Sequence, residues 1–420
     1  MPRCCIAVLL ALAVCDLATA EESSTSDSGA PKGVKASLVY NAAAFADVVG
    51  GARTGATYTS NLNVQLDIDG AAVLGWPDTI AHLDGLWLQG GLPSSFVGDA
   101  QGVSNISAPN DVKLYEAWVQ KKSFLRNQVS VLAGLYDLNS EFYRLQSAGL
   151  FLNSSFGIGP EFAQSGVEGP SIFPYTSVGV RVALKPVEGV VIRTAVLDGV
   201  PVDRPNGSHG VFESGDGVLI VGEVDFVDRP ALKARPSNQR FRIGRQAMLG
   251  EYEAKVAVGG WYYTASFADL SETQSDGQPV RHRGSGGLYM LIDRLLYKRP
   301  DRPDQKLTGF VQTGISDDRV NRFGSYLGAG LTLFAPFKDR SADELGIGLA
   351  YARNGSHYVS AQRMQGLPVT NAEKTIELTY LIQVNSWLAL QPDLQYVISP
   401  NTNPALSNAL ALQLRFEITF

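Results

Sequence analysis

Cysteine is nearly absent from this chain. Its 420 residues include three cysteines, Cys4, Cys5 and Cys15, all within the first fifteen positions. Residues 1–20 contain a basic residue, a short apolar core and an Ala-Thr-Ala ending, which predicts a secretory signal peptide cleaved after Ala20. Because cleavage would remove every cysteine, we expect an exported protein with no disulfide bond and no thiolate metal site.

Long apolar runs are also missing. No stretch approaches the roughly eighteen apolar residues that a membrane-spanning helix needs, and the apolar core of residues 1–20 is too short to span a bilayer. A lipoprotein anchor at Cys15 is an alternative to simple cleavage, although Val14 is large where such sites have a small residue. Residues 21–33 are polar and lack periodicity, which predicts a disordered linker before a domain at 34–420.

Histidine is scarce and the net charge is small. The four histidines, His82, His209, His282 and His357, show no metal-ligand spacing and accompany no nucleophile motif, which disfavours a metal centre and catalysis. We interpret each of them as a loop or surface residue. The chain also lacks a phosphate-binding glycine loop, so no cofactor is expected. A net charge of −6 argues against nucleic acid as a partner.

The chain is rich in segments that alternate between apolar and polar residues. The stretch NALALQLRFEITF at 408–420 has Leu, Phe or Ile on every second position and mostly polar residues between them. Side chains on a strand alternate between its faces, so such a segment has one apolar face. The same pattern predicts about sixteen amphipathic strands. They lie near 35–46, 56–69, 81–90, 112–121, 128–136, 175–185, 189–197, 217–227, 253–263, 285–294, 306–315, 324–334, 344–354, 374–385, 387–398 and 408–420.

The connections between these strands mostly alternate between tight and long. Short turns at one rim and long loops at the other are typical of a closed antiparallel transmembrane β-barrel, whose apolar face contacts lipid. We therefore expect an all-β barrel in the outer membrane of a Gram-negative bacterium. The long connections are expected at 91–111, 137–174, 198–216, 264–284 and 355–373, while 227–252 and 316–323 break the alternation.

Two alternatives to a barrel of sixteen strands are open. A further strand within 228–252 would change the strand count by one or two. A soluble β-sandwich or propeller would show the same alternation, but the predicted strands are longer than those folds usually contain. Tyrosine and phenylalanine near strand ends, namely Tyr351, Tyr380, Tyr396 and Phe420, suit the aromatic girdles of a membrane barrel.

Blocks along nearly the whole mature chain resemble the carbohydrate-selective porins of the OprB type. The most specific are LNSSFG, within 148–160, and LQPDLQYV, within 387–398. The resemblance implies an outer-membrane channel of the same strand number that passes glucose and related sugars. It also implies a constricted, charged lumen and often a homotrimer. Residues 228–252 fit the family pattern least well.

A sugar-selective pore needs hydrogen-bonding groups and an aromatic surface where it narrows, because lining chemistry and width together set selectivity. On 112–121 we expect Tyr115 on the lipid face, and we interpret Trp118 with its polar neighbours as a platform for sugar. The alternative is that Trp118 fills space against a loop folded into the barrel. Strand parity assigns these residues to the lumen: Glu116, Trp118, Gln120, Arg181, Arg193, Glu223, Asp225, Trp261 and Asp293.

The two arginines in this set lie on adjacent strands. Arg181 and Arg193 flank a tight turn, and an arginine at the bilayer midplane costs about 2–4 kcal/mol, so both are expected to face the lumen or a rim. From the other side of the pore, Glu223 and Asp225 would offset the positive charges of these two arginines. A lining of both signs would favour neutral polar solutes over ions.

The connection 137–174 is too long for a simple turn and too apolar for a solvated loop. We expect it to fold into the barrel and form the constriction, with a rim loop that packs on its neighbours or on another protomer as the alternative. The residues expected to reach the solute pathway are Phe142, Tyr143, Arg144 and Asn153.

The sequence thus predicts an outer-membrane porin that passes carbohydrates by passive diffusion, and no enzymatic activity. A general or anion-preferring porin is one alternative. An outer-membrane barrel enzyme such as a lipase or protease is another, which the scarcity of histidine disfavours. A soluble exported sugar-binding β protein is the third.

Overall fold

The structure is a computed structural model that describes residues 33–124, 128–201, 203–204, 207–208, 210–228 and 252–420. The predicted signal peptide and nearly all of the predicted linker lie outside these residues. So do His209 and almost all of the region at 228–252 where a further strand was considered. Within the part of the chain that is described, no helix is long and apolar enough to cross a membrane.

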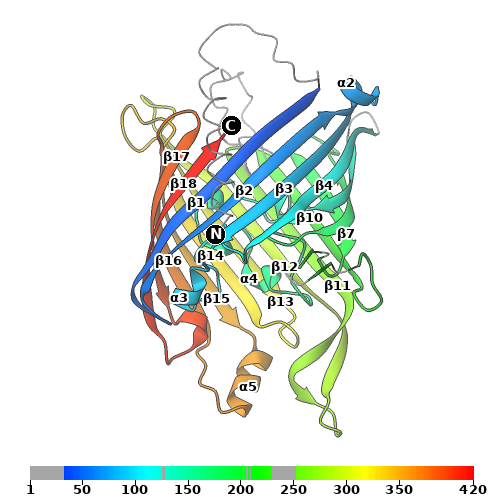
Figure 1. Ribbon diagram of the computed structural model, residues 1–420, viewed down its shortest axis with the longest axis vertical. Helices are drawn as coiled ribbons and strands as arrows, with labels where there is room; N and C mark the ends of the chain where they lie inside the picture. The colour runs from blue at the N-terminus through cyan, green and yellow to red at the C-terminus, as the bar shows by residue number, and fades with distance from the viewer. Residues whose placement is uncertain (1–32, 125–127, 202, 205–206, 209, 229–251) are drawn as a thin grey trace, which may run out of the picture.

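Sixteen strands form one closed antiparallel barrel, as predicted (Figure 1). Each strand pairs with its neighbour in sequence, and β1 closes the sheet by pairing with β18, with Ala44 opposite Leu414. A small hairpin of β8 and β9 lies outside the barrel sheet. The barrel strands are β1 Val34–Gly51, β2 Gly55–Asp69, β3 Thr79–Gly90, β4 Asp111–Phe124, β5 Val129–Tyr136, β6 Ser177–Leu184, β7 Val190–Asp198, β10 Val218–Asp228, β11 Ala254–Thr273, β12 Pro279–Lys298, β13 Lys306–Ser316, β14 Phe323–Phe334, β15 Glu344–Asn354, β16 Ala372–Gln383, β17 Leu388–Ile398 and β18 Ser407–Thr419; the small hairpin is β8 Asp203–Arg204 and β9 Gly207–Ser208.

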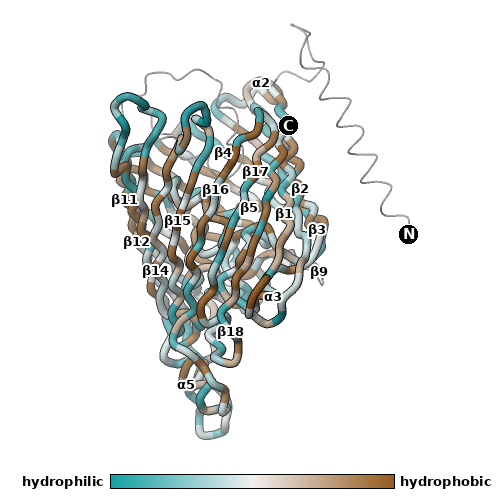
Figure 2. Tube along the Cα trace, turned by 90° about the vertical axis from the view of Figure 1, so that its left-hand side faces the viewer, coloured by the Kyte–Doolittle hydropathy of each residue, from teal (hydrophilic) through white to brown (hydrophobic). Residues whose placement is uncertain are grey.

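Most strands carry exposed apolar residues on their outer face. On β18, Leu412 and Leu414 are 41% and 39% exposed, whereas Gln413 and Arg415 between them are buried inside the barrel. Hydrophobic and hydrophilic residues alternate in the same way along most strands (Figure 2). An exposed apolar outer wall is suited to lipid, because closure pairs the backbone groups of every strand within the sheet.

Exposed aromatic side chains lie at both ends of the barrel. Tyr396 and Phe420, two of the residues expected in aromatic girdles, are among them, and Trp387 stacks on Phe420 at 6.2 Å. These positions match the two membrane interfaces of a transmembrane barrel. The exposed aromatic residues of the described chain are Trp76, Phe226, Tyr297, Phe337, Trp387 and Phe420 towards the rim with short turns, and Tyr58, Phe212, Tyr262 and Tyr396 towards the opposite rim.

The longer connections start from the rim opposite the short turns, and they contain most of the short helices. One prediction there is wrong: 264–284 is no loop, because β11 and β12 continue as a long hairpin around a turn at 274–278. Beyond Tyr263 and Ser285, this hairpin extends past its neighbours β10 and β13 (Figure 1). The helices are α2 Gly70–Leu74, α3 Ser94–Val97, η1 Leu138–Ser140, η2 Ala148–Leu150, η3 Ser154–Phe156, α4 Pro160–Ala163, α5 Ser356–Met364 and η4 Pro400–Thr402.

An ionic contact attaches α5 to this projecting hairpin. The carboxylate of Asp269 on β11 accepts hydrogen bonds from His357 Nδ1 of α5 at 2.9 Å and from His282 Nε2 of β12 at 2.8 Å. The hydrogen bond to Asp269 raises the pKa of His357 above its ordinary 6.5. Asp269, His282 and His357 all lie outside the membrane-spanning wall. The other charged groups that act on His357 are Glu272 and Asp318.

This contact predicts a pH-dependent attachment of α5. Because the pKa of His357 is raised in the folded state, its stabilising contribution is complete below pH 6.5 and is lost as pH rises through the raised pKa. We expect residues 356–364 to exchange amide hydrogens faster at about pH 8.5 than at about pH 5.5, after correction for intrinsic rates. The variant His357→Gln should lose most of this difference. An undiminished difference in the variant would contradict the assignment.

Candidate functional site

The connection between β5 and β6, residues 137–176, folds into the barrel and is named here the inner loop. Its backbone N–H groups bind carboxylates on the far wall: Tyr143 N donates to Glu223 at 2.8 Å, and Ser147 N donates to Asp293 at 2.9 Å. Further along, Leu152 N donates to Glu377 at 2.6 Å. Acidic side chains of β10, β12 and β16 therefore fix the position of the inner loop inside the lumen.

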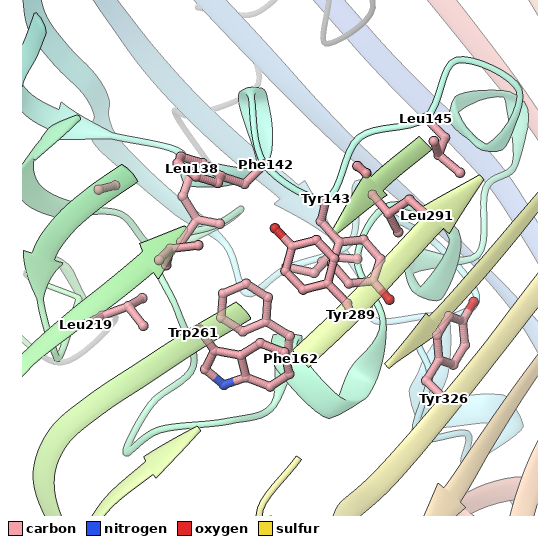
Figure 3. Close-up of a cluster of buried hydrophobic side chains, with 14 of the residues drawn as sticks. Leu138, Phe142, Tyr143, Leu145, Phe162, Leu219, Trp261, Tyr289, Leu291 and Tyr326 are labelled. Atoms are coloured by element: carbon pink, nitrogen blue, oxygen red, sulfur yellow. The ribbon is translucent and has the colours of Figure 1, made fainter. Parts of the chain in front are cut away.

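Aromatic packing holds the same loop against the wall. Phe162 of α4 stacks on Trp261 of β11, with ring centroids 4.2 Å apart and an angle of 13° between the rings (Figure 3). Tyr143 packs against Tyr289, with ring centroids 4.5 Å apart. On β15, a Cβ at Gly348 would lie 2.8 Å from the Phe156 ring, so the glycine provides space for the loop. The inner loop and the wall thus form one packed core within the barrel.

A network of four charged residues lies beneath the inner loop. Arg193 of β7 forms ion pairs with Asp225 and Glu223 of β10, and Lys255 of β11 lies 3.2 Å from Asp225. The expectation that the two acids offset arginines across the pore is corrected, because β7 and β10 are neighbouring strands. Lys255 also donates to the backbone carbonyl of Arg144 in the inner loop at 2.9 Å. The two acidic and two basic side chains neutralise one another, and through Lys255 they hold the inner loop in place.

Arg181 has a similar role on β6. It is 1% exposed, and its guanidinium Nε lies 2.6 Å from Glu141 of the inner loop. Its Nη1 also donates to the Ser130 hydroxyl at 2.7 Å. Trp261 and Asp293 also contact the inner loop, as described above. Several side chains that strand parity assigned to the lumen therefore face inward, but they contact the loop instead of an open pathway.

The four loop residues that we expected at the pathway are buried. Phe142, Tyr143 and Asn153 have no exposed surface and Arg144 is 4% exposed. Asn153 donates to Gln395 on β17 at 3.1 Å, which attaches the loop to the wall. Their position therefore differs from the expectation that these side chains reach the solute pathway. The inner loop enters the lumen as expected, but these four side chains pack into it or against the wall.

The least covered part of the lumen wall lies on β1 to β4. Most lumen-facing residues of β10 to β18 are buried beneath the inner loop and the connection 91–110, whereas some polar side chains on β1, β2 and β4 keep part of their surface exposed, namely Asn41, Asn63, Gln65, Asp67 and Gln120. Asn63 and Gln65 of β2 both donate to Asp84 of β3, at 3.0 and 2.8 Å. We use the name polar strip for the partly exposed Asn41, Asn63, Gln65 and Asp67 together with the buried Asn61 and Asp84 that lie beside them.

Sequence reasoning did not select the polar strip as a site, although its signal was present. The alternation in 56–69 assigns Asn61, Asn63, Gln65 and Asp67 to one face of a strand. What the sequence lacked was the information that other walls would be covered by loops. Gln120, which was selected, lies on the same side of the barrel with intermediate exposure, opposite Ile80.

A β-bulge changes the parity of β4 beside the polar strip. The pairing of β3 with β4 shifts between Asp84 and Gly85, which lie opposite Glu116 and Leu114. Tyr115 is therefore 5% exposed and donates to Asp137 at 2.5 Å, so its assignment to the lipid face is wrong. The bulge leaves Glu116 facing inward, where it accepts a hydrogen bond from Asp137 N at 3.0 Å.

One histidine joins this region. His82 of β3 is not the loop or surface residue that we expected, because it lies on the lumen face and stacks on Trp118, 4.9 Å between ring centroids. Trp118 itself is 8% exposed. Two groups among the described residues have ligand atoms close enough to hold a metal ion: His82, Asp84 and Glu116 in the lumen, and Asp269, Glu272 and His357 at the rim.

Comparison with solved structures supports the barrel architecture. The high-pH structure of OprB from Pseudomonas putida is similar with a TM-score of 0.79 and 19% identity, over 93% of this chain and 94% of that one. The outer-membrane channel DcaP of Acinetobacter baumannii gives a TM-score of 0.54 and 7% identity, over 95% of this chain and 100% of that one. At these identities the likeness shows the fold.

Sequence comparison identifies the family. Porin B of Pseudomonas aeruginosa is 25% identical over 200 residues, and the alignment spans 43% of this chain and 43% of that protein. The family model described as carbohydrate-selective porin, OprB family, matches residues 53–420. The chain therefore belongs to the OprB family of carbohydrate-selective porins.

Proposed function

We propose that the barrel gives passive, selective diffusion of glucose-like carbohydrates along the polar strip. The observation that supports this is the distribution of exposure: Asn41, Asn63, Gln65 and Asp67 of the polar strip keep part of their surface exposed, while most lumen-facing residues of β10 to β18 are buried. As a member of a porin family, the chain is an outer-membrane channel of a Gram-negative bacterium. The family and fold indicate a channel and not an enzyme.

The chemistry of the polar strip suits a neutral solute with many hydroxyl groups. The amides of Asn63 and Gln65 both donate and accept hydrogen bonds, so they can exchange partners with sugar hydroxyls as the solute passes. Binding at such a surface is weak enough for release, which conduction requires. Because Arg193 and Arg181 are paired with acids of the wall and loop, neither leaves a strong charge that would favour ions.

Two partners remain part of the proposal. The exposed apolar outer wall supports contact with outer-membrane lipid. Assembly as a homotrimer rests on the family resemblance. Crosslinking of the detergent-extracted protein is expected to yield three linked chains, and a single uncrosslinked species would contradict the trimer.

Liposome swelling tests the proposed function. We expect purified wild-type protein to admit glucose faster than size alone predicts, with a low chloride current in the same membranes. Replacing Gln65 by Leu should lower the glucose rate severalfold, because an amide that faces the lumen is replaced by an apolar group. The matched control is Gln274→Leu, at the tip of the exposed β11–β12 hairpin, which should leave the rate unchanged.

Two results would count against the proposal. If sugars and other neutral solutes entered at rates set by size alone, the pore would be a general one. A chloride current that dominated over sugar flux would indicate an anion-preferring porin.

A further inference from the structure

Three potential metal ligands lie together on the lumen wall of β3 and β4. One ligand atom from each of His82, Asp84 and Glu116 lies within 4.8 Å of the others. His82 and Asp84 are two residues apart on β3 and so share a face, and Asp84 lies directly opposite Glu116. Glu116 keeps the inward face that it shares with Trp118 and Gln120, because the bulge in β4 begins only beyond it.

The imidazole of His82 is oriented as metal-binding histidines usually are. Its Nδ1 lies 2.8 Å from Asp67 Oδ1, and Nε2 lies 4.0 Å from Glu116 Oε2. When Nδ1–H donates to Asp67, the neutral ring presents the Nε2 lone pair to the side of Glu116. A carboxylate bound to the far nitrogen of a ligating histidine is the common outer-shell arrangement in metal sites.

The local charge also favours a cation. Like charges directly opposite each other on paired strands destabilise a sheet, and Asp84 and Glu116 form such a pair. Asp84 also accepts side-chain hydrogen bonds from the amides of Asn63 and Gln65. An ion between the two carboxylates would offset their repulsion.

We propose that His82, Asp84 and Glu116 bind a divalent transition-metal ion such as Zn²⁺, with Asp67 as a positioning residue. One imidazole and two carboxylates are suitable ligands for this class of ion. Ligand atoms of a tetrahedral site with bonds of about 2.0–2.1 Å lie about 3.4 Å apart, so ligand atoms as far apart as 4.8 Å would have to approach by about 1.4 Å through side-chain rotation. His82 and Glu116 keep 10% and 12% of their side-chain surface exposed, so the site is reached from the lumen and its fourth position is open to water.

The group at the rim is a weaker candidate. The carboxylate of Asp269 accepts hydrogen bonds from the backbone N–H of Ser271 and Glu272 and from both His282 and His357. A metal ion there would have to replace several of these interactions. The rim group is better explained as the attachment point of α5.

Metal titration of the purified full-length barrel tests the lumen site. Zn²⁺ is titrated into the detergent-solubilised protein in competition with a chromogenic chelator. We expect one ion per chain, with at least about tenfold weaker binding in His82→Gln and about 10–100-fold weaker binding in Asp67→Asn. The matched control is His282→Gln, which removes a histidine at the rim and should bind like the wild type. Heat-dependent migration on gels establishes that each variant is a folded barrel.

A crystal soaked with Zn²⁺ provides a second measurement. Anomalous density between the three side chains is the expected result. The proposal would be overturned by wild-type protein that takes up no Zn²⁺, by equal affinity in wild type and His82→Gln, or by density confined to another place. None of these outcomes depends on whether sugars pass through the pore.

Discussion

Excision of residues 142–156 is expected to raise the single-channel conductance severalfold. This segment fills the lumen against β10 to β17, and current through a water-filled barrel depends on the width of its narrowest part. The gap can be closed with a short glycine-serine linker, because Asn139 Nδ2 donates to the carbonyl of Gly157 at 3.0 Å, which places the cut ends close together. Conductance is recorded in planar bilayers for variant and wild type.

The control for this excision shortens the chain at the rim. Removal of residues 274–278 at the tip of the β11–β12 hairpin changes the chain outside the lumen, so the conductance should stay near that of wild type. If the variant without 142–156 folded and conducted like the wild type, the inner loop would not determine the width of the pore.

Replacement of Glu223 by Ala is expected to destabilise the barrel by about 3–5 kcal/mol, the range for a buried ion pair that loses one partner. The Glu223 side chain is fully buried and accepts hydrogen bonds from Tyr143 N at 2.8 Å and Tyr289 Oη at 2.7 Å. Its loss also leaves Arg193 and Lys255 with Asp225 as their remaining carboxylate within this network. The free energy of unfolding is measured by denaturant titration in lipid vesicles.

The comparison is with Glu188→Ala, in the exposed turn between β6 and β7. That side chain is in solvent, so its removal should change the unfolding free energy by a few tenths of a kcal/mol at most, about the scale of a surface substitution. Equal stability of the two variants would show that the charged network does not stabilise the wall.

The strands were predictable because the alternation of apolar and polar residues that identifies a strand lies within its own sequence. Alternation depends on neighbours in sequence, so 408–420 could be recognised as a strand with an outward apolar face without any knowledge of its partners. All sixteen predicted strands have counterparts in the barrel. The inward course of the inner loop was also predictable, because a long apolar connection needs a surface to pack against.

Features that depend on pairing between strands were not predictable. The bulge at Tyr115 arises from the register of β4 against β3, and no local residue pattern indicates it. Similarly, 264–284 is polar enough to look like a loop, but its residues pair across a hairpin that extends beyond the barrel wall.

Strand parity predicts on which face of the wall a candidate residue lies, but it does not predict what that residue does there. In the structure, Glu223 and Asp293 bind backbone N–H groups of the inner loop. Their partners in the inner loop lie far away in sequence, so their function as anchors could not be inferred. His82 was missed for the same reason, because Asp67, Glu116 and Trp118 meet it only when β2, β3 and β4 are paired.

The anchoring of the inner loop has a consequence for the order of assembly. Leu152 and Asn153 bind residues that follow them by 225 and 242 positions in the chain. Contacts between such distant segments form late, because the intervening chain must first be ordered. A newly inserted barrel would therefore pass through a stage in which the sheet is closed but the lumen is still wide. The lumen would narrow only when the inner loop binds the wall.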